Sequence, residues 1–159
     1  MSTLFVRESE VYREATHDQV LTGAANALAR RFRVGSPVLK DPTAAREFLL
    51  IHLATLPYEV FGCLYLNCRH RLLGREQLFR GTLDTASVHS REIIRSCLAY
   101  NAASLILYHN HPSGDPSPSV ADETITRHIS DAIRSIDVRL IDHWVFGESV
   151  FSFSEHGLL

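Results

Sequence analysis

The sequence predicts an α/β domain, and three observations favour this fold class. Segments with apolar residues at helical spacing alternate along the chain with short, nearly continuous apolar runs that are typical of buried strands. The chain has 159 residues, 45% of them hydrophobic, which is enough for one packed core. Neither internal repeats nor low-complexity tracts interrupt this pattern. One folded domain is therefore the default expectation.

The first 40 residues (1–40) are predicted to form an N-terminal helical arm and a linker. Residues 10–33 carry apolar side chains at helical spacing, and the Gly-Ser-Pro segment 35–37 is typical of a linker. The domain itself is expected over residues 41–159. Its first helix should begin at Pro42, because proline suits the first helical position.

The remaining elements follow from the same periodicities. Apolar runs predict strands, regularly spaced isoleucines predict one face of a helix, and Ser90 is a candidate helix cap. In chain order, we expect a core helix that stops before Pro57, a hairpin of strands 60–66 and 71–79, a helix over 90–100, a strand over 104–108, a helix over 119–136, and strands over 138–146 and 150–153.

The composition argues against several classes of function. With 16 basic and 18 acidic residues, the formal charge is −2, so no overall positive field would draw the chain to a phosphate backbone or an anionic membrane. The three cysteines form no CxxC pair and are interpreted as reduced, buried, small hydrophobic residues. The sequence shows no signal-like start and no run of about 18 apolar residues, which favours the cytoplasm.

A candidate metal site follows directly after the strand predicted over 104–108. His109 and His111 lie two positions apart, so in an extended backbone their side chains point to the same side and can offer two nitrogens to one metal ion. Prolines and a glycine over residues 112–118 would turn the chain back, so that Asp122, in the first turn of the next helix, can supply a third ligand. Two nitrogens and one carboxylate oxygen suit zinc.

Two further residues are candidates for catalysis. Three protein ligands leave a fourth position for water, and Zn²⁺ lowers the pKa of such a water to about 7. Glu59, immediately before an apolar strand, is the candidate general base and is not expected to bind the metal. Desolvation at the sheet edge could raise the pKa of this carboxyl toward the working range. Ser119 is a candidate hydrogen-bond donor to the oxyanion.

These residues also have plain structural explanations. Ser119 and Asp122 have the S-x-x-D spacing of a capping box, and two histidines at a strand end can simply hydrogen-bond to the backbone. Glu59 alone carries little information. His143, within a predicted strand, is more often a hydrogen-bonded core residue than a ligand or a proton shuttle. The metal interpretation is favoured because these features converge on one edge of the sheet.

The same residues resemble the JAMM motif of the JAB/MPN metalloprotease family, which is a glutamate followed at a distance by H-x-H-P, six residues, S, two residues and D. Glu59 is similar to the upstream glutamate of that motif. The other matching positions are His109, His111, Pro112, Ser119 and Asp122. Longer phrases are similar to the bacterial RadC-like branch and extend the resemblance over about residues 41–159: LFRGTLDTASVH at 78–89, NAASLILYHNHPSGDP at 101–116 and FSFSEHGLL at 151–159.

This resemblance implies a mixed β-sheet flanked by helices, in the MPN/JAB (cytidine deaminase-like) architecture. It also implies a Zn²⁺ ion held by the two histidines and the aspartate, and a metalloprotease that cleaves a peptide or isopeptide bond in a protein or peptide substrate. The DNA-repair label of the RadC-like branch leaves a metal-dependent nuclease or repair factor as an alternative, and a non-catalytic interaction domain is a third. Many longer members carry a helix-hairpin-helix segment ahead of the catalytic domain; the first 40 residues show no such glycine-bearing hairpin, so a short form is expected.

Overall fold

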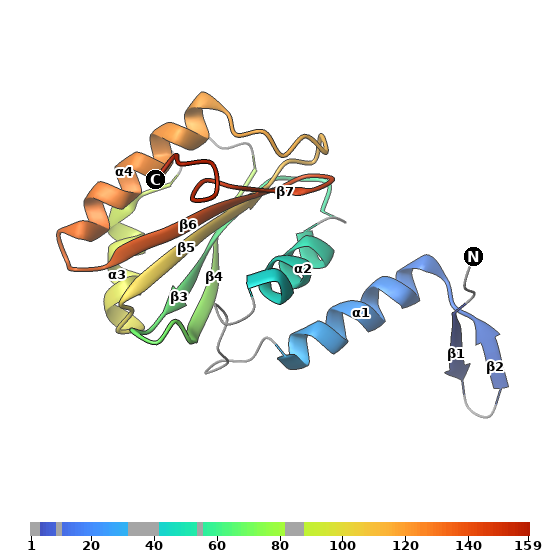
Figure 1. Ribbon diagram of the computed structural model, residues 1–159. Coiled ribbons are helices and arrows are strands. Elements are labelled where there is room, and N and C mark those ends of the chain that lie inside the picture. The colour runs from blue at the N-terminus through green and yellow to red at the C-terminus, as the bar shows by residue number, and fades with distance from the viewer. Residues whose placement is uncertain (1–3, 9–10, 32–41, 54–55, 82–87) are drawn as a thin grey trace.

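A five-stranded mixed sheet forms the centre of the computed structural model, which describes residues 4–8, 11–31, 42–53, 56–81 and 88–159 (Figure 1). The strands are β3 (Val60–Leu66), β4 (Leu72–Arg80), β5 (Ser104–Asn110), β6 (Arg139–Phe146) and β7 (Val150–Ser152). Their order across the sheet is β4-β3-β5-β6-β7. Strands β5 and β6 are parallel, and the other neighbouring pairs are antiparallel.

Helices cover both faces of this sheet (Figure 1). Helix α2 (Pro42–Leu53) packs on one face, and α3 (Ser90–Ala99) and α4 (Val120–Arg134) pack on the other. Strand β3 is buried along its whole length because its side chains alternate between the two cores. The predicted mixed sheet flanked by helices is therefore confirmed. No helix within these described ranges is long and apolar enough to cross a membrane.

The connection from β5 to β6 places the site. Because the two strands are parallel, the chain must cross over between them, and α4 forms this crossover. The loop over residues 111–119 leaves the C-terminal end of β5 and leads into α4, so the end of the strand and the start of the helix lie at the same edge of the sheet. The spacing of the buried isoleucines at 125, 129 and 133 explains why α4 lies flat on the sheet.

The N-terminal part differs from its prediction. It consists of a β-hairpin of β1 (Phe5–Glu8) and β2 (Val11–Glu14), followed by α1 (His17–Arg31), which contacts α2. A single helix over 10–33 is therefore wrong for residues 11–14. The helix begins only at His17, because Thr16 and Gln19 form a reciprocal cap: the Thr16 amide donates to Gln19 Oε1 (3.0 Å) and the Gln19 amide donates to Thr16 Oγ1 (3.2 Å). The predicted linker over 35–37 lies outside the described residues.

Two smaller expectations also fail, the cap at Ser90 and the burial of all three cysteines. Ser90 does not cap α3: it is the first helical residue, its hydroxyl has no hydrogen-bond partner, and the N-cap position belongs to His89. Helix α2 stops before Pro57, as expected: Leu56 already lies outside the helix, and its amide donates to the Leu53 carbonyl (3.0 Å). All three cysteines are free as expected, but Cys68 is exposed in the turn between β3 and β4.

Candidate metal centre

The C-terminal end of β5 brings the two predicted histidine ligands to one face of the sheet. His109 is paired with Phe61 of β3 and with Val145 of β6. His111 lies just beyond the strand, and its backbone N–H donates to the carbonyl of Phe146 (2.7 Å). This pairing keeps the backbone extended through both histidines, so their side chains point the same way, as the H-x-H spacing predicts.

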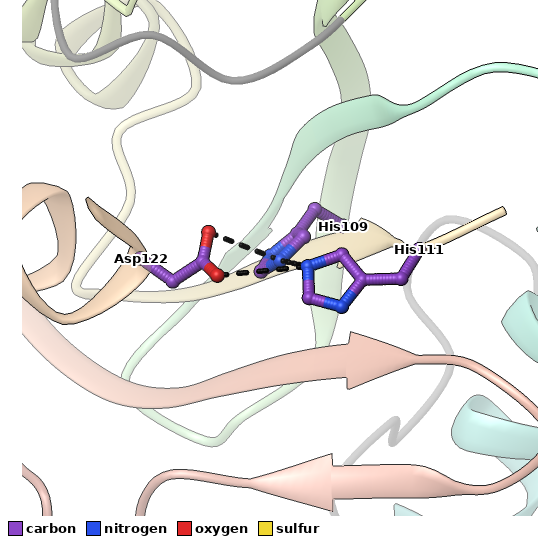
Figure 2. A group of neighbouring side chains, drawn as sticks. All are labelled: His109, His111 and Asp122. Carbon is purple, nitrogen blue, oxygen red and sulfur yellow. Dashed lines mark hydrogen bonds and ion pairs between the residues drawn. The ribbon is translucent and has the colours of Figure 1, made fainter. Parts of the chain in front are cut away.

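Asp122 completes a compact group with the two histidines (Figure 2). Its Oδ1 lies 3.2 Å from His109 Nε2, its Oδ2 lies 3.5 Å from His111 Nε2, and the two Nε2 atoms are 3.0 Å apart. His109 and Asp122 are buried, whereas His111 is partly exposed. Within the described part of the chain, this is a group whose ligand atoms all lie within 4.8 Å of one another. The structure brings the three predicted ligands together; that they bind a metal stays a prediction.

The loop after β5 fixes the orientation of His111. Its Nδ1 lies 2.8 Å from the backbone carbonyl of Asp115, which can only accept a hydrogen bond, so Nδ1 carries the proton. In the neutral ring, Nε2 then presents a lone pair toward His109 Nε2. Two nitrogen atoms 3.0 Å apart need a hydrogen or a cation between them. The donor chemistry of the site therefore fits a bound cation.

Asp122 serves the helix and the site at the same time. The amide and the hydroxyl of Ser119 donate to Asp122 Oδ2 (2.7 and 2.6 Å), and the Asp122 amide donates to Ser119 Oγ (3.1 Å). The capping box is thus present, while Oδ1 stays free of it and faces His109. Because the Ser119 hydroxyl hydrogen is directed at Asp122, its predicted donation to a substrate oxygen requires this bond to be given up.

Glu59 lies immediately before β3, two residues from Phe61, which pairs with His109. It is partly buried, and its negative charge acts to raise the pKa values of both His109 and His111. The side chain of Asn110, the residue between the two histidines, anchors the backbone on either side of Glu59. Its Oδ1 accepts from the Val60 amide (2.8 Å) and its Nδ2 donates to the Tyr58 carbonyl (3.1 Å). Nothing in the sequence pattern pointed to this role of Asn110.

A second buried histidine contacts the candidate ligands. His143 of β6 is fully buried, and its Nε2 lies 2.8 Å from His109 Nδ1. Its Nδ1 lies 2.6 Å from the hydroxyl of Thr126 in α4. Burial lowers the pKa of His143 well below its usual value, so the ring is neutral. His143 is therefore a hydrogen-bonded core histidine, the more frequent of the two roles weighed from the sequence.

The electrostatics of the group favour a negative carboxylate. Burial acts to raise the pKa of Asp122, but its contacts with His109 and His111 outweigh burial and hold this pKa well below the usual range. The hydrogen bond to Asp122 raises the pKa of His111, whereas burial lowers that of His109. Without a metal ion, a proton on His111 compensates the negative charge of Asp122. A divalent cation placed among these atoms would take over this role.

A pocket of about 230 Å³ opens beside His111, around the edge of the sheet on the α2 side. Its walls combine apolar and polar groups: Leu50, Leu53, Leu56, Pro112 and Phe146 contribute, together with Asn110, His111, Gly114, Gly147 and Glu148. The pocket offers room for a small apolar group close to the candidate metal centre.

Comparisons with known proteins agree with this geometry. A family model described as RadC-like JAB domain matches residues 39–158. A UPF0758 protein of Thioalkalivibrio sulfidiphilus is 54% identical over 121 residues, which cover 76% of this chain and 54% of that protein. A UPF0758 protein of Methylibium petroleiphilum is 49% identical over 141 residues, which cover 88% of this chain and 63% of that protein. The chain therefore spans between half and two thirds of the length of these curated relatives.

Proposed function

Because the chain belongs to the RadC-like JAB domain family, we propose that it is a zinc-dependent hydrolase that cleaves a peptide or isopeptide bond in a protein or peptide substrate. One observation carries the proposal: two imidazole Nε2 atoms and a buried carboxylate converge within 4.8 Å at the edge of the sheet. Several residues of the chain act together in this proposal, and each has a separate task.

His109, His111 and Asp122 would hold the metal ion. Two nitrogens and one oxygen match the ligands that zinc prefers, and three protein ligands are the number found in catalytic rather than structural sites. When bound, zinc supplies Lewis acidity, which polarises a substrate carbonyl and makes water a stronger acid. The Ser119 hydroxyl holds the Asp122 carboxylate in place through its 2.6 Å hydrogen bond.

Glu59 would move the proton. In the proposed reaction, its carboxylate takes a proton from the attacking water as the new C–O bond forms, and gives the proton to the amine nitrogen as the C–N bond breaks. Its position supports this task, because it lies at the sheet edge close enough to influence both histidines. The two hydrogen bonds from Asn110 fix the backbone that carries Glu59, so the carboxylate is held in a defined place.

The metal site is tested first, by measuring zinc content with mass spectrometry in the purified chain. We expect close to one zinc ion per chain in the wild type and its loss from His109→Ala, His111→Ala and Asp122→Ala. His128→Ala is the matched control, because His128 is an exposed histidine on α4 and has no place in the site. Stoichiometric zinc in all three ligand variants would end the proposal.

The base and the substrate class are tested together with Glu59→Gln, which should keep zinc and lose turnover. Proteomes of cells that express the wild type or this variant are compared, and uncleaved proteins should accumulate in the variant. Glu92→Gln, at a glutamate paired with Arg95 on α3, serves as the control. Full activity of Glu59→Gln would show that the base is misassigned. Zinc-dependent cleavage of DNA with no protein target would replace the peptide substrate by a phosphodiester.

A further inference from the structure

We propose that His143, held by Thr126, is a positioning residue that fixes the tautomer of His109 and so directs the His109 Nε2 lone pair into the metal site. The inference rests on the proposed metal site and adds to it two residues that lie outside the ligand set. It concerns the metal-free chain as much as the metal-bound one, because the contacts that carry it need no metal.

The position of His143 is fixed by packing on all sides. Its ring stacks on Phe153 (ring centroids 4.7 Å apart, 26° between planes) and meets the ring of Phe61 edge-on (5.7 Å, 77°). Its backbone is paired with Leu107 in the neighbouring strand β5. The ring therefore has one orientation, with Nδ1 toward Thr126 and Nε2 toward His109.

The direction of each hydrogen bond follows from the first one. The Thr126 hydroxyl lies 2.5 Å from the backbone carbonyl oxygen of Asp122, and this oxygen has no hydrogen, so Thr126 donates. The hydroxyl has then used its single hydrogen and must accept one from His143 Nδ1 (2.6 Å). The His143 ring is fully buried against Phe61 and Phe153, where a second ring hydrogen and its charge would be costly, so its Nε2 accepts the hydrogen of His109 Nδ1 (2.8 Å).

This chain of bonds leaves His109 Nε2 without a hydrogen. That atom lies 3.0 Å from His111 Nε2 and 3.2 Å from Asp122 Oδ1, where a ligand lone pair is required. In the other tautomer, Nε2 would carry the hydrogen, donate it to Asp122 and be unable to bind a metal. Groups that fix the tautomer of a ligating histidine in this way typically change metal affinity by about 10- to 100-fold when they are removed.

Helix α4 carries both a candidate ligand, Asp122, and the first residue of the hydrogen-bond chain that runs from Thr126 through His143 to His109. Asp122 and Thr126 are four residues apart, one helical turn, so the residue that starts the hydrogen-bond chain bonds to the backbone of a ligand residue. From Thr126 the hydrogen-bond chain continues to His143 in β6 and then to the candidate ligand His109 in β5. One helical turn thus supplies both a carboxylate ligand and the group that orients a histidine ligand.

The test uses Thr126→Val, which keeps the shape of the side chain and removes the hydroxyl. Thr124→Val is the matched control, since the Thr124 hydroxyl makes the same bond to a carbonyl four residues earlier (2.8 Å to Val120), but Thr124 is exposed, whereas Thr126 and His143 are buried. Thr126→Ser restores the hydroxyl. At the next step, His143→Phe removes the ring nitrogens, and His143→Gln offers an amide oxygen in place of Nε2.

The first readout is the tautomer of His109, measured by long-range ¹H–¹⁵N NMR on the metal-free full chain. We expect the Nδ1–H form in the wild type, in Thr124→Val and in Thr126→Ser, and gain of the Nε2–H form in Thr126→Val. The second readout is zinc affinity by competition with a chelator, which should fall about tenfold or more in Thr126→Val and His143→Phe, and recover in Thr126→Ser and His143→Gln.

Two outcomes would overturn the inference. One is a His109 tautomer in the metal-free wild type with the hydrogen on Nε2. The other is an unchanged tautomer and zinc affinity in folded Thr126→Val. If the wild type binds no zinc at all, the proposed function fails instead, and the tautomer measurement alone still decides whether His143 acts as described.

Discussion

Replacing Asp142 by asparagine should destabilise the fold by about 3 kcal/mol, because each of its carboxylate oxygens accepts at least two hydrogen bonds, which an amide NH₂ group cannot accept. Oδ1 accepts from the backbone amides of His143 (2.8 Å) and Ser154 (3.0 Å). Oδ2 accepts from the indole of Trp144 (2.6 Å) and the hydroxyl of Ser152 (2.7 Å), and more distantly from the guanidinium of Arg46 (3.5 Å). Asparagine must turn its NH₂ group toward one of these pairs of donors.

The magnitude follows from the two bonds lost. Hydrogen bonds to a charged group contribute about 1.5 kcal/mol each at the lower end, so two of them amount to about 3 kcal/mol. The hydroxyl of Ser152 can rotate and accept from the new amide, which sets a lower limit of about 1.5 kcal/mol. For a chain of this size, such a loss lowers the melting temperature by about 2 to 4 °C per kcal/mol.

The assay is urea unfolding followed by fluorescence of Trp144, the only tryptophan in the sequence and a direct partner of Asp142. Measurements on the metal-free chain separate this effect from zinc binding. Asp131→Asn is the control, because Asp131 is exposed on α4 and should change stability by no more than about 0.5 kcal/mol. If Asp142→Asn unfolds within that same margin of the wild type, the buried carboxylate does not bind β6 and β7 together as described.

Three more results are expected. Zinc at about 100 times its dissociation constant should stabilise the wild type by about 2.7 kcal/mol in thermal unfolding and leave Asp122→Ala unchanged; equal shifts in both would place the zinc elsewhere. Asn110→Ala should keep zinc but reduce turnover about tenfold or more, because it releases the backbone on either side of Glu59; unchanged turnover would mean that Asn110 does not position this segment. Alkylation of the native chain at about pH 8, mapped by mass spectrometry, should label Cys68 first. Burial raises the pKa of the Cys63 thiol, and it raises the pKa of the Cys97 thiol to about 11. Rapid labelling of either buried thiol would contradict this expectation.

The sequence predicted the sheet domain and the ligand group well, for local reasons. The H-x-H spacing needs only an extended backbone, and the S-x-x-D spacing needs only a helix start, so both could be recognised without knowing the rest of the fold. The capping box and the ligand position of Asp122 were weighed as rival explanations. The structure contains the cap and also places the carboxylate at the histidines, because the two oxygens of one side chain face different partners.

Other features depend on contacts between distant segments and left no local pattern. His109 and His143 are 34 residues apart in sequence and meet only through the parallel register of β5 and β6. Thr126 sits inside a regular amphipathic helix, where a single polar residue on the buried face gives no sign of its partner. The two hydrogen bonds of Asn110 depend on how β3 is paired with β5, which the sequence around Asn110 does not reveal.

The N-terminal hairpin was missed because the same helical spacing runs through it. Strands β1 and β2 have four residues each, and β2 is exposed along its length, so no alternation between buried and exposed positions marked it as a strand. The start of α1 is set by the cap at Thr16 and Gln19, whose T-x-x-Q spacing is typical of a helix start. This local cap determines where the helix begins, although the helical spacing of apolar residues extends further toward the N-terminus.

Asp122 both caps α4 and faces the histidines, and this limits how the candidate metal centre could be transferred to another protein. Three ligands grafted alone onto a new scaffold would lack the serine that orients the carboxylate, the loop carbonyl that holds one imidazole and the threonine four residues further along the helix. The smallest portable unit is the continuous strand, loop and helix from Ser104 to Arg134, accompanied by a parallel strand that delivers His143. A designer would therefore transfer the complete strand–helix–strand crossover connection. A scaffold that lacks two parallel neighbouring strands could not accommodate this unit.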